Sequence, residues 1–308
     1  MTGQSRTSFK QWMPSTRVFI LTLLAMIAFA GNSLLCRLAL KQTGVDAASF
    51  TSVRILSGAA ALWLIARIGG GAHGATGSWS SAVALFVYAA AFSFAYVSLP
   101  AGTGALLLFG AVQATMILSG LWAGERLRKQ QSVGLAFALA GLVGLLLPGL
   151  SSPPIRGAIL MLGAGVAWGI YSLRGRGAGD PVNATAGNFL RAAPLAMGLS
   201  FVLLPWARLD SAGIGYAALS GALASGVGYA VWYTALRGLK ATSAATVQLS
   251  VPVIAAVGGI VFLGEPITLR LLIASTVIFG GIALVLIVRR PDSVLKTEAV
   301  RKAGDEPS

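Results

Sequence analysis

The amino-acid sequence predicts an all-α integral membrane protein of ten transmembrane helices, arranged as two inverted five-helix repeats. Of the 308 residues, 56% are hydrophobic and only 10% are charged, and the mean hydropathy is +0.80. Ordinary soluble domains carry about 25% charged residues. Apolar stretches, the distribution of basic residues and an internal similarity carry the prediction further.

Ten apolar stretches are long enough to cross a bilayer, which takes about 20 residues. They occupy residues 18–40, 47–66, 80–99, 102–123, 131–149, 157–173, 183–204, 212–236, 242–263 and 269–288. Prolines mark several boundaries, among them Pro100, Pro148 and Pro181. We therefore divide the chain into an N-terminal tail, two five-helix repeats and a C-terminal tail. Their ranges are 1–17, 18–149, 155–288 and 289–308.

The basic residues gather on one side of the predicted membrane. If the ten spans alternate in direction, 16 Lys and Arg residues lie on the side of both termini and 4 on the other. Cytoplasmic loops are enriched in Lys and Arg, so we expect both termini in the cytoplasm and a bacterial inner-membrane location. The apolar run from Val18 to Ile27, followed by Ala28-Phe29-Ala30, also resembles a cleavable signal peptide. Cleavage would remove most of the first helix, which the repeat requires.

The second half of the chain repeats the first. At an offset of 140, Gly124-Glu125 coincides with Gly264-Glu265, and Gly141 coincides with Gly281. At an offset of 137, Arg37 and Arg54 coincide with Arg174 and Arg191. Five helices is an odd number, so the second copy must enter the membrane from the opposite side. Inverted repeats are typical of secondary carriers, whose substrate site lies between the halves near the midplane.

Several classes of function are disfavoured by composition. The single cysteine, Cys36, and the single histidine, His73, exclude a disulfide framework and a Cys/His metal cluster, and we expect no cofactor. An intramembrane enzyme would need a nucleophile with a base or an H-E-x-x-H pair, and the sequence contains neither. The net charge of +14 is explained by cytoplasmic loops, not by a nucleic-acid partner. All nine acidic residues lie at span ends or in tails, so we expect no proton-coupling carboxylate.

Polar and aromatic side chains inside the spans are the candidates for a substrate site. An unsatisfied polar group is costly in a bilayer, so these residues must face other helices or a wet cavity. The candidates are Asn32, Ser33, Tyr88, Phe92, Phe109, Gln113, Trp168, Tyr171, Trp232 and Gln248. Aromatic residues at helical spacing also serve for packing or interfacial anchoring, and that alternative stays open. A ring-lined cavity with a few amides suits amino acids with apolar or aromatic side chains.

Five further residues are expected to have structural roles. They are Arg54, Glu125, Arg191, Pro252 and Glu265. In each Gly-Glu pair, glycine permits a turn, and the carboxylate is expected near the positive N-terminal end of the next helix. The two arginines are expected to snorkel or to bond to backbone carbonyls. A cation facing a substrate carboxylate is the alternative. Pro252 predicts a kink that the first repeat lacks, because Val112 stands there.

The runs A-G-E-R-L-R (123–128), L-G-E-P-I-T (263–268) and V-P-V-I-A-A-V-G-G (251–259), with the segments around Arg54 and Arg191, resemble EamA-type transporters of the drug/metabolite transporter superfamily. The resemblance implies a ten-helix carrier, usually an exporter of amino acids or other small metabolites. The aromatic amino acid exporters of the YddG type are one such subgroup. The expected partners are a small-molecule substrate and the lipid bilayer, and a monomer is compatible with this. Export of drugs or other metabolites, and flipping of lipid-linked substrates, remain alternatives.

Overall fold

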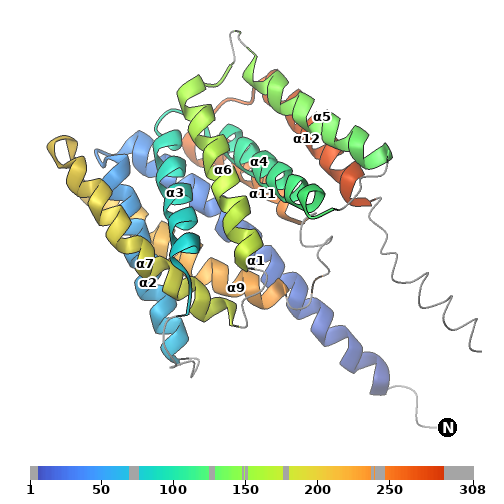
Figure 1. Ribbon diagram of the computed structural model, residues 1–308, viewed down its shortest axis with the longest axis horizontal. Helices are drawn as coiled ribbons and strands as arrows, with labels where there is room; N and C mark the ends of the chain where they lie inside the picture. The colour runs from blue at the N-terminus through green and yellow to red at the C-terminus, as the bar shows by residue number, and fades with distance from the viewer. Residues whose placement is uncertain are drawn as a thin grey trace, which may run out of the picture.

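The computed structural model describes residues 6–68, 76–124, 129–147, 149, 152–175, 180–236, 239 and 247–287, and within them all regular structure is helical (Figure 1). The first half contains α1 (Arg6–Gln42), α2 (Ala47–Ile68), α3 (Trp79–Tyr96), α4 (Ala101–Trp122) and α5 (Lys129–Leu146). The second half contains α6 (Ile155–Gly175), α7 (Pro181–Val202), the short 3-10 helix η1 (Leu204–Trp206), α8 (Ser211–Leu219), the π-helix η2 (Ser220–Val227), α9 (Gly228–Leu236), α11 (Ser250–Leu263) and α12 (Leu269–Ile287). Each of the ten predicted apolar stretches is therefore helical, at least in part.

Among the described helices, seven are both long and apolar enough to cross a bilayer. They are α1 from Thr16 onward, α2, α3, α4, α5, α6 and the continuous run Ser211–Leu236. The helices α11 and α12 are apolar but shorter, at Ser250–Leu263 and Leu269–Leu284. The 22-residue helix α7 is less apolar, since it carries Asn183, Asn188, Arg191 and Pro194. The chain is thus a multi-pass membrane protein.

The helix predicted over 242–263 is interrupted near its middle. In the structure, Val247 and Gln248 are helical, Leu249 forms a turn, and α11 begins at Ser250. Proline has no backbone N–H, so Pro252 leaves the carbonyl of Gln248 without its usual helical partner. Pro252 thus lies in the first turn of α11, directly after this interruption.

The main helix–helix contacts of the fold are symmetric: when two helices pack together, their counterparts in the other half also pack together. Helix α6 packs on α3 and α4, and its counterpart α1 packs on α8, η2, α9 and α11. Helix α3 also contacts α7, as α2 contacts α8 and η2. The remaining pairs join counterparts: α2 with α7, α4 with α11, and α5 with α12. Figure 1 shows α5 and α12 side by side at one end of the bundle.

Glycine permits the close contact between α5 and α12. A Cβ atom on Gly281 would lie 2.5 Å from the carbonyl oxygen of Gly134 and 2.6 Å from the amide nitrogen of Ala138. On the other helix, a Cβ atom on Gly141 would lie 2.7 Å from Ile278 Cγ1. Gly141 and Gly281 are repeat counterparts, so an equivalent glycine allows close packing on each side of this interface.

The predicted turns at the two Gly-Glu pairs are confirmed for glycine. Gly124 and Gly264 have φ angles of 90° and 62°, in a region of backbone conformation that residues with a Cβ atom avoid. At the end of α11, the amide of Gly264 donates to the carbonyl of Ile260, as in the αL motif that closes many helices, and the amide of Glu265 donates to the carbonyl of Gly259. Glu125 lies outside the described residues.

The carboxylate of Glu265 is buried and binds two groups from the first repeat. Its Oε1 accepts a hydrogen bond from Arg37 Nε at 3.0 Å, and its Oε2 accepts one from the amide of Ala101 at 2.7 Å. Arg37 Nη1 donates in addition to the carbonyls of Tyr96 and Val97 at the end of α3. A helix N-terminus was expected here, but it belongs to α4 rather than to the next helix, α12, because α11 packs against α4. In the described part of the chain this is the single ion pair.

A second connection joins two loops. The Asp46 carboxylate caps α2 by accepting from the amides of Ala48 and Ser49, and it also accepts from the amide of Arg208 at 2.9 Å. The amide of Asp46 donates in return to the carbonyl of Arg208. Partial burial acts to raise the pKa of Asp46, but the hydrogen bonds from Ser49, Arg208 and Ala48 outweigh it and leave the pKa below its usual value.

Candidate functional site

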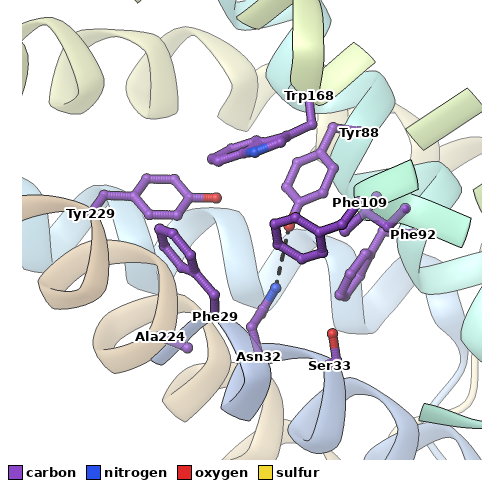
Figure 2. A pocket seen from close by; sticks show the side chains of 10 residues that line it. Phe29, Asn32, Ser33, Tyr88, Phe92, Phe109, Trp168, Ala224 and Tyr229 are labelled. Atoms are coloured by element: carbon purple, nitrogen blue, oxygen red, sulfur yellow. Dashed lines mark hydrogen bonds between the residues drawn. The ribbon is translucent and has the colours of Figure 1, made fainter. Parts of the chain in front are cut away.

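A small cavity lies where helices from both halves meet (Figure 2). From the first half it is lined by Phe29, Asn32 and Ser33 of α1, Tyr88 and Phe92 of α3, and Leu108 and Phe109 of α4. From the second half it is lined by Trp168 of α6, Ala224 of η2 and Tyr229 of α9. Six of the ten residues proposed from sequence are among them: Asn32, Ser33, Tyr88, Phe92, Phe109 and Trp168.

Aromatic rings close this cavity. The Trp168 ring lies 4.7 Å from the ring of Tyr88 and 5.1 Å from that of Tyr229, measured between centroids. Phe29 packs edge-on against Tyr229 at 5.8 Å, and Phe92 lies 5.4 Å from Tyr88. The rings therefore form a connected group that joins α1, α3, α6 and α9, and a solute larger than a few atoms must separate them to enter.

Two polar side chains extend from α1 toward the rings. Asn32 Oδ1 accepts a hydrogen bond from Ser220 Oγ at 2.6 Å, and Asn32 Nδ2 donates to the Tyr88 hydroxyl at 3.3 Å. The Asn32 amide is therefore held between the two halves. The hydroxyl of Ser33 points toward the cavity beside Phe92 (Figure 2).

Arg54 of α2 lies directly behind the wall formed by Tyr88 and Phe92. Arg54 is only 2% exposed to solvent. Its guanidinium carbon lies 5.1 Å from the ring centroid of Tyr88 and 4.8 Å from that of Phe92. Nη2 donates to the Tyr88 hydroxyl at 3.0 Å, and Nε donates to Ser225 Oγ at 3.4 Å. Nη1 is buried without a hydrogen-bond partner.

The two repeat-related arginines thus have different surroundings. Arg191 is partly exposed and donates from Nη1 to the carbonyl of Gly187 in its own helix, the kind of bond expected for both residues. Arg54 neither reaches the surface nor bonds to a backbone carbonyl, because the rings of Tyr88 and Phe92 enclose its guanidinium group.

Four of the proposed site residues do not line the cavity. Tyr171 and Trp232 form a second layer: Tyr171 packs on Trp168 at 5.4 Å, and Trp232 packs on Phe29 at 5.8 Å. Gln113 is buried one turn beyond Phe109 on α4. Gln248 is partly buried and helical, directly before the turn at Leu249 that precedes α11, and it does not line the cavity.

The π-helix η2 supplies contacts that sequence reasoning missed. Ser220 binds Asn32, Ala224 lines the cavity, and Ser225 binds Arg54. Short π-helical segments within α-helices occur frequently at functional sites. The segment also passes very close to α2, since a Cβ atom on Gly221 would lie 2.1 Å from the carbonyl oxygen of Arg54.

The lining residues absent from the sequence proposal are Phe29, Leu108, Ala224 and Tyr229. Phe29 precedes Asn32 and Ser33 by one helical turn, so the helical period alone could have placed it on their face. Leu108 and Ala224 carry no feature that distinguishes them from other apolar residues of a span.

In the described part of the chain, no three His, Cys, Asp or Glu side chains come together as a metal site.

Comparison with known proteins gives two matches to one family. Residues 16–147 and residues 155–287 each match the EamA-like transporter family. An uncharacterized protein of Pseudomonas aeruginosa is 59% identical over 278 residues, which cover 90% of this chain and 97% of the relative. The threonine/homoserine exporter RhtA of Escherichia coli K12 is 32% identical over 172 residues, or 53% of this chain and 57% of the exporter.

A solved crystal structure of another protein has the same fold. It superposes with a TM-score of 0.64 and covers 90% of this chain and 99% of its own, at 19% sequence identity. At that identity the likeness concerns the arrangement of helices only.

Proposed function

We propose that this chain, which belongs to the EamA-like transporter family, is a secondary carrier that exports amino acids through the cavity between its two repeats. The family relatives with printed functions are transporters rather than enzymes, and one of them is an exporter of threonine and homoserine. The observation that carries the proposal is the cavity itself, which takes its lining from α1, α3 and α4 of one half and from α6, η2 and α9 of the other.

We further propose that the helices form ten spans in two inverted repeats. Two observations support this arrangement. The two family matches have similar lengths, and the main helix–helix contacts also occur between the repeat counterparts of the same helices. On this proposal α7, α11 and α12 also cross the membrane, as the counterparts of α2, α4 and α5. The excess of basic residues on one side supports cytoplasmic termini and an inner-membrane location.

The proposed substrates are amino acids with apolar or aromatic side chains. Seven aromatic or aliphatic side chains, with Ala224, surround the cavity, and Asn32, Ser33 and the Tyr88 hydroxyl provide its polar contacts. Ligand pockets are commonly apolar with a few precisely placed polar groups that orient the ligand. Because the rings already touch one another, binding requires that α6 and α9 separate from α1 and α3, which is the motion that alternating access supplies.

The proposed transport is not driven by protons. None of the residues lining the cavity is acidic, and the buried carboxylate of Glu265 is held by Arg37 and the N-terminus of α4. A carboxylate that exchanges protons with a substrate must lie where the substrate competes for it. The substrate gradient is therefore the expected source of free energy.

The test is uptake of labelled amino acids, nucleosides and organic cations into proteoliposomes. The parent protein should take up amino acids, and Trp168→Ala should lower uptake by about tenfold, as loss of a ring worth at least 1.4 kcal/mol would. Gln248→Ala is the matched control, since Gln248 lies in an apolar span but away from the cavity. Uptake of nucleosides or cations without amino acids would refute the substrate class, and equal uptake by both variants would refute the cavity.

A further inference from the structure

The positive charge of Arg54 has no negative partner in the described part of the protein. The single ion pair there joins Arg37 to Glu265, and Arg54 bonds only to the hydroxyls of Tyr88 and Ser225. A guanidinium group stays protonated in proteins, so Arg54 cannot lower the cost of burial by losing its charge. The faces of Tyr88 and Phe92 offset part of this cost by cation–π attraction. They contribute no full negative charge.

The unpaired nitrogen lies one side-chain layer from the cavity. The two rings that cover the guanidinium group, Tyr88 and Phe92, are both part of the cavity wall. Ser225, which binds Nε, directly follows the lining residue Ala224. Displacement of these two rings would therefore join the guanidinium group of Arg54 to the cavity.

The Tyr88 hydroxyl connects Arg54 to the cavity. Its oxygen accepts hydrogen bonds from Asn32 Nδ2 and from Arg54 Nη2, so neither bond uses its hydrogen atom. An acceptor in the cavity could take that hydrogen. A carboxylate would meet the Tyr88 hydroxyl first and the free Nη1 of Arg54 behind it.

We propose that Arg54 is the receptor for the carboxylate of the transported solute. This inference rests on the proposed function and names the group of the amino acid that is recognised. Hydrogen bonds between a guanidinium group and a carboxylate are about twice as strong as neutral ones, and most so where water is excluded. The repeat counterpart Arg191 is bonded within its own helix, so the site offers one cation and favours solutes with one carboxylate.

The experiment compares solutes that differ only in the carboxylate. Proteoliposome uptake of labelled leucine or phenylalanine is measured in competition with the same amino acid, with its amide, in which an uncharged carboxamide replaces the carboxylate, and with its decarboxylated amine. The parent should prefer the acid by about 10- to 100-fold, as expected for a hydrogen bond to a charged group. Arg54→Gln should remove this preference, and Arg54→Lys should keep part of it because the charge remains. Arg191→Gln, the matched control, should leave it unchanged.

Two measurements keep the inference open to refutation if Arg54→Gln does not fold. Tyr88→Phe retains the ring but lacks the hydroxyl, so it should reduce the preference for the acid several-fold without altering the far-UV circular dichroism spectrum. Carboxylic acids without an amino group are compared with their amides in the same way. If the parent takes up no amino acid but prefers these acids, the proposed function fails and the role of Arg54 stands. If the parent transports amino acids and their amides equally, or if folded Arg54→Gln keeps the preference, the role of Arg54 is refuted.

Discussion

Replacement of Glu265 by alanine is expected to destabilise the protein more than replacement of an exposed charged residue. The Glu265 side chain joins the end of α11 to Arg37 of α1 and to the first amide of α4, and Arg37 in turn holds the end of α3. Four helices therefore meet at one buried carboxylate. Without it, the amide of Ala101 loses its acceptor and the Arg37 guanidinium loses its counter-charge.

The size of the expected stability loss depends on which hydrogen bonds Arg37 and the amide of Ala101 retain in each variant. Removing one member of a buried ion pair costs about 3–5 kcal/mol when the other is left uncompensated. Arg37 retains hydrogen bonds to the carbonyls of Tyr96 and Val97, so the low end, about 3 kcal/mol, is expected for Glu265→Ala. Glu265→Gln keeps an acceptor for the amide of Ala101, and it should cost about 1.5 kcal/mol.

The assay is reversible unfolding in mixed micelles by a denaturing detergent, followed by far-UV circular dichroism. Arg37→Met, Glu265→Gln and the double variant complete a cycle, and the double variant should cost less than the sum of the single ones by at least about 1 kcal/mol. Arg208→Ala removes an exposed cation and should change stability by less than about 0.5 kcal/mol. Additivity within about 0.5 kcal/mol, or a Glu265→Ala cost no larger than that of the control, would refute the reasoning.

Three further predictions concern a loop, a helix contact and the energy source. Asp46→Ala should lower the free energy of unfolding by about 1–2 kcal/mol at pH 7, because a helix cap is lost. The folded-state pKa of Asp46 lies below its unfolded value, so the stability difference between parent and variant should be fully present above about pH 4. It should shrink as the pH falls through the folded-state pKa, as followed by circular dichroism unfolding curves. Gly221→Ala should cost about 1–3 kcal/mol, because its new Cβ would lie 2.0 Å from Ser57 Oγ, whereas Gly215→Ala, which meets nothing within 4 Å, should be neutral in the same unfolding assay. Amino acid uptake at a fixed substrate gradient should change by less than about twofold when a pH difference across the vesicle is removed, and a loss of uptake would contradict the proposal that transport is not driven by protons.

The helices could be predicted from the sequence because bilayer thickness sets the length of an apolar stretch. The turn at Gly264 could be predicted as well, since only glycine adopts its positive φ angle without strain. The partner of Glu265 could not, because α4 reaches it through packing of segments 164 residues apart in the chain. The π-helical turns of η2 were also beyond prediction, since the run from 212 to 236 is mostly apolar and its scattered serines and glycines do not show where the helix widens.

The candidate site could be predicted in part, through polarity. Asn32 and its neighbour Ser33 stand out because an unsatisfied polar group is costly within a span, and the structure places both at the cavity. Gln248 gave the same signal, but the break before α11 leaves it elsewhere. For Arg54, the sequence indicated a costly buried charge without showing which helix would face it, and that depends on the close contact between α2 and η2.

In the proposed alternating carrier, the buried guanidinium group of Arg54 would also determine how the membrane potential acts on the protein. Moving one elementary charge through 100 mV changes the energy by about 2.3 kcal/mol. With the cavity open to one solution, Arg54 would experience most of the electric potential of that solution. A negative cell interior would then favour the empty carrier facing the cytoplasm, where the proposed export begins. Over a full cycle the guanidinium group would return to its starting place. On this proposal the potential sets the resting orientation of the carrier but performs no net work on a zwitterionic substrate.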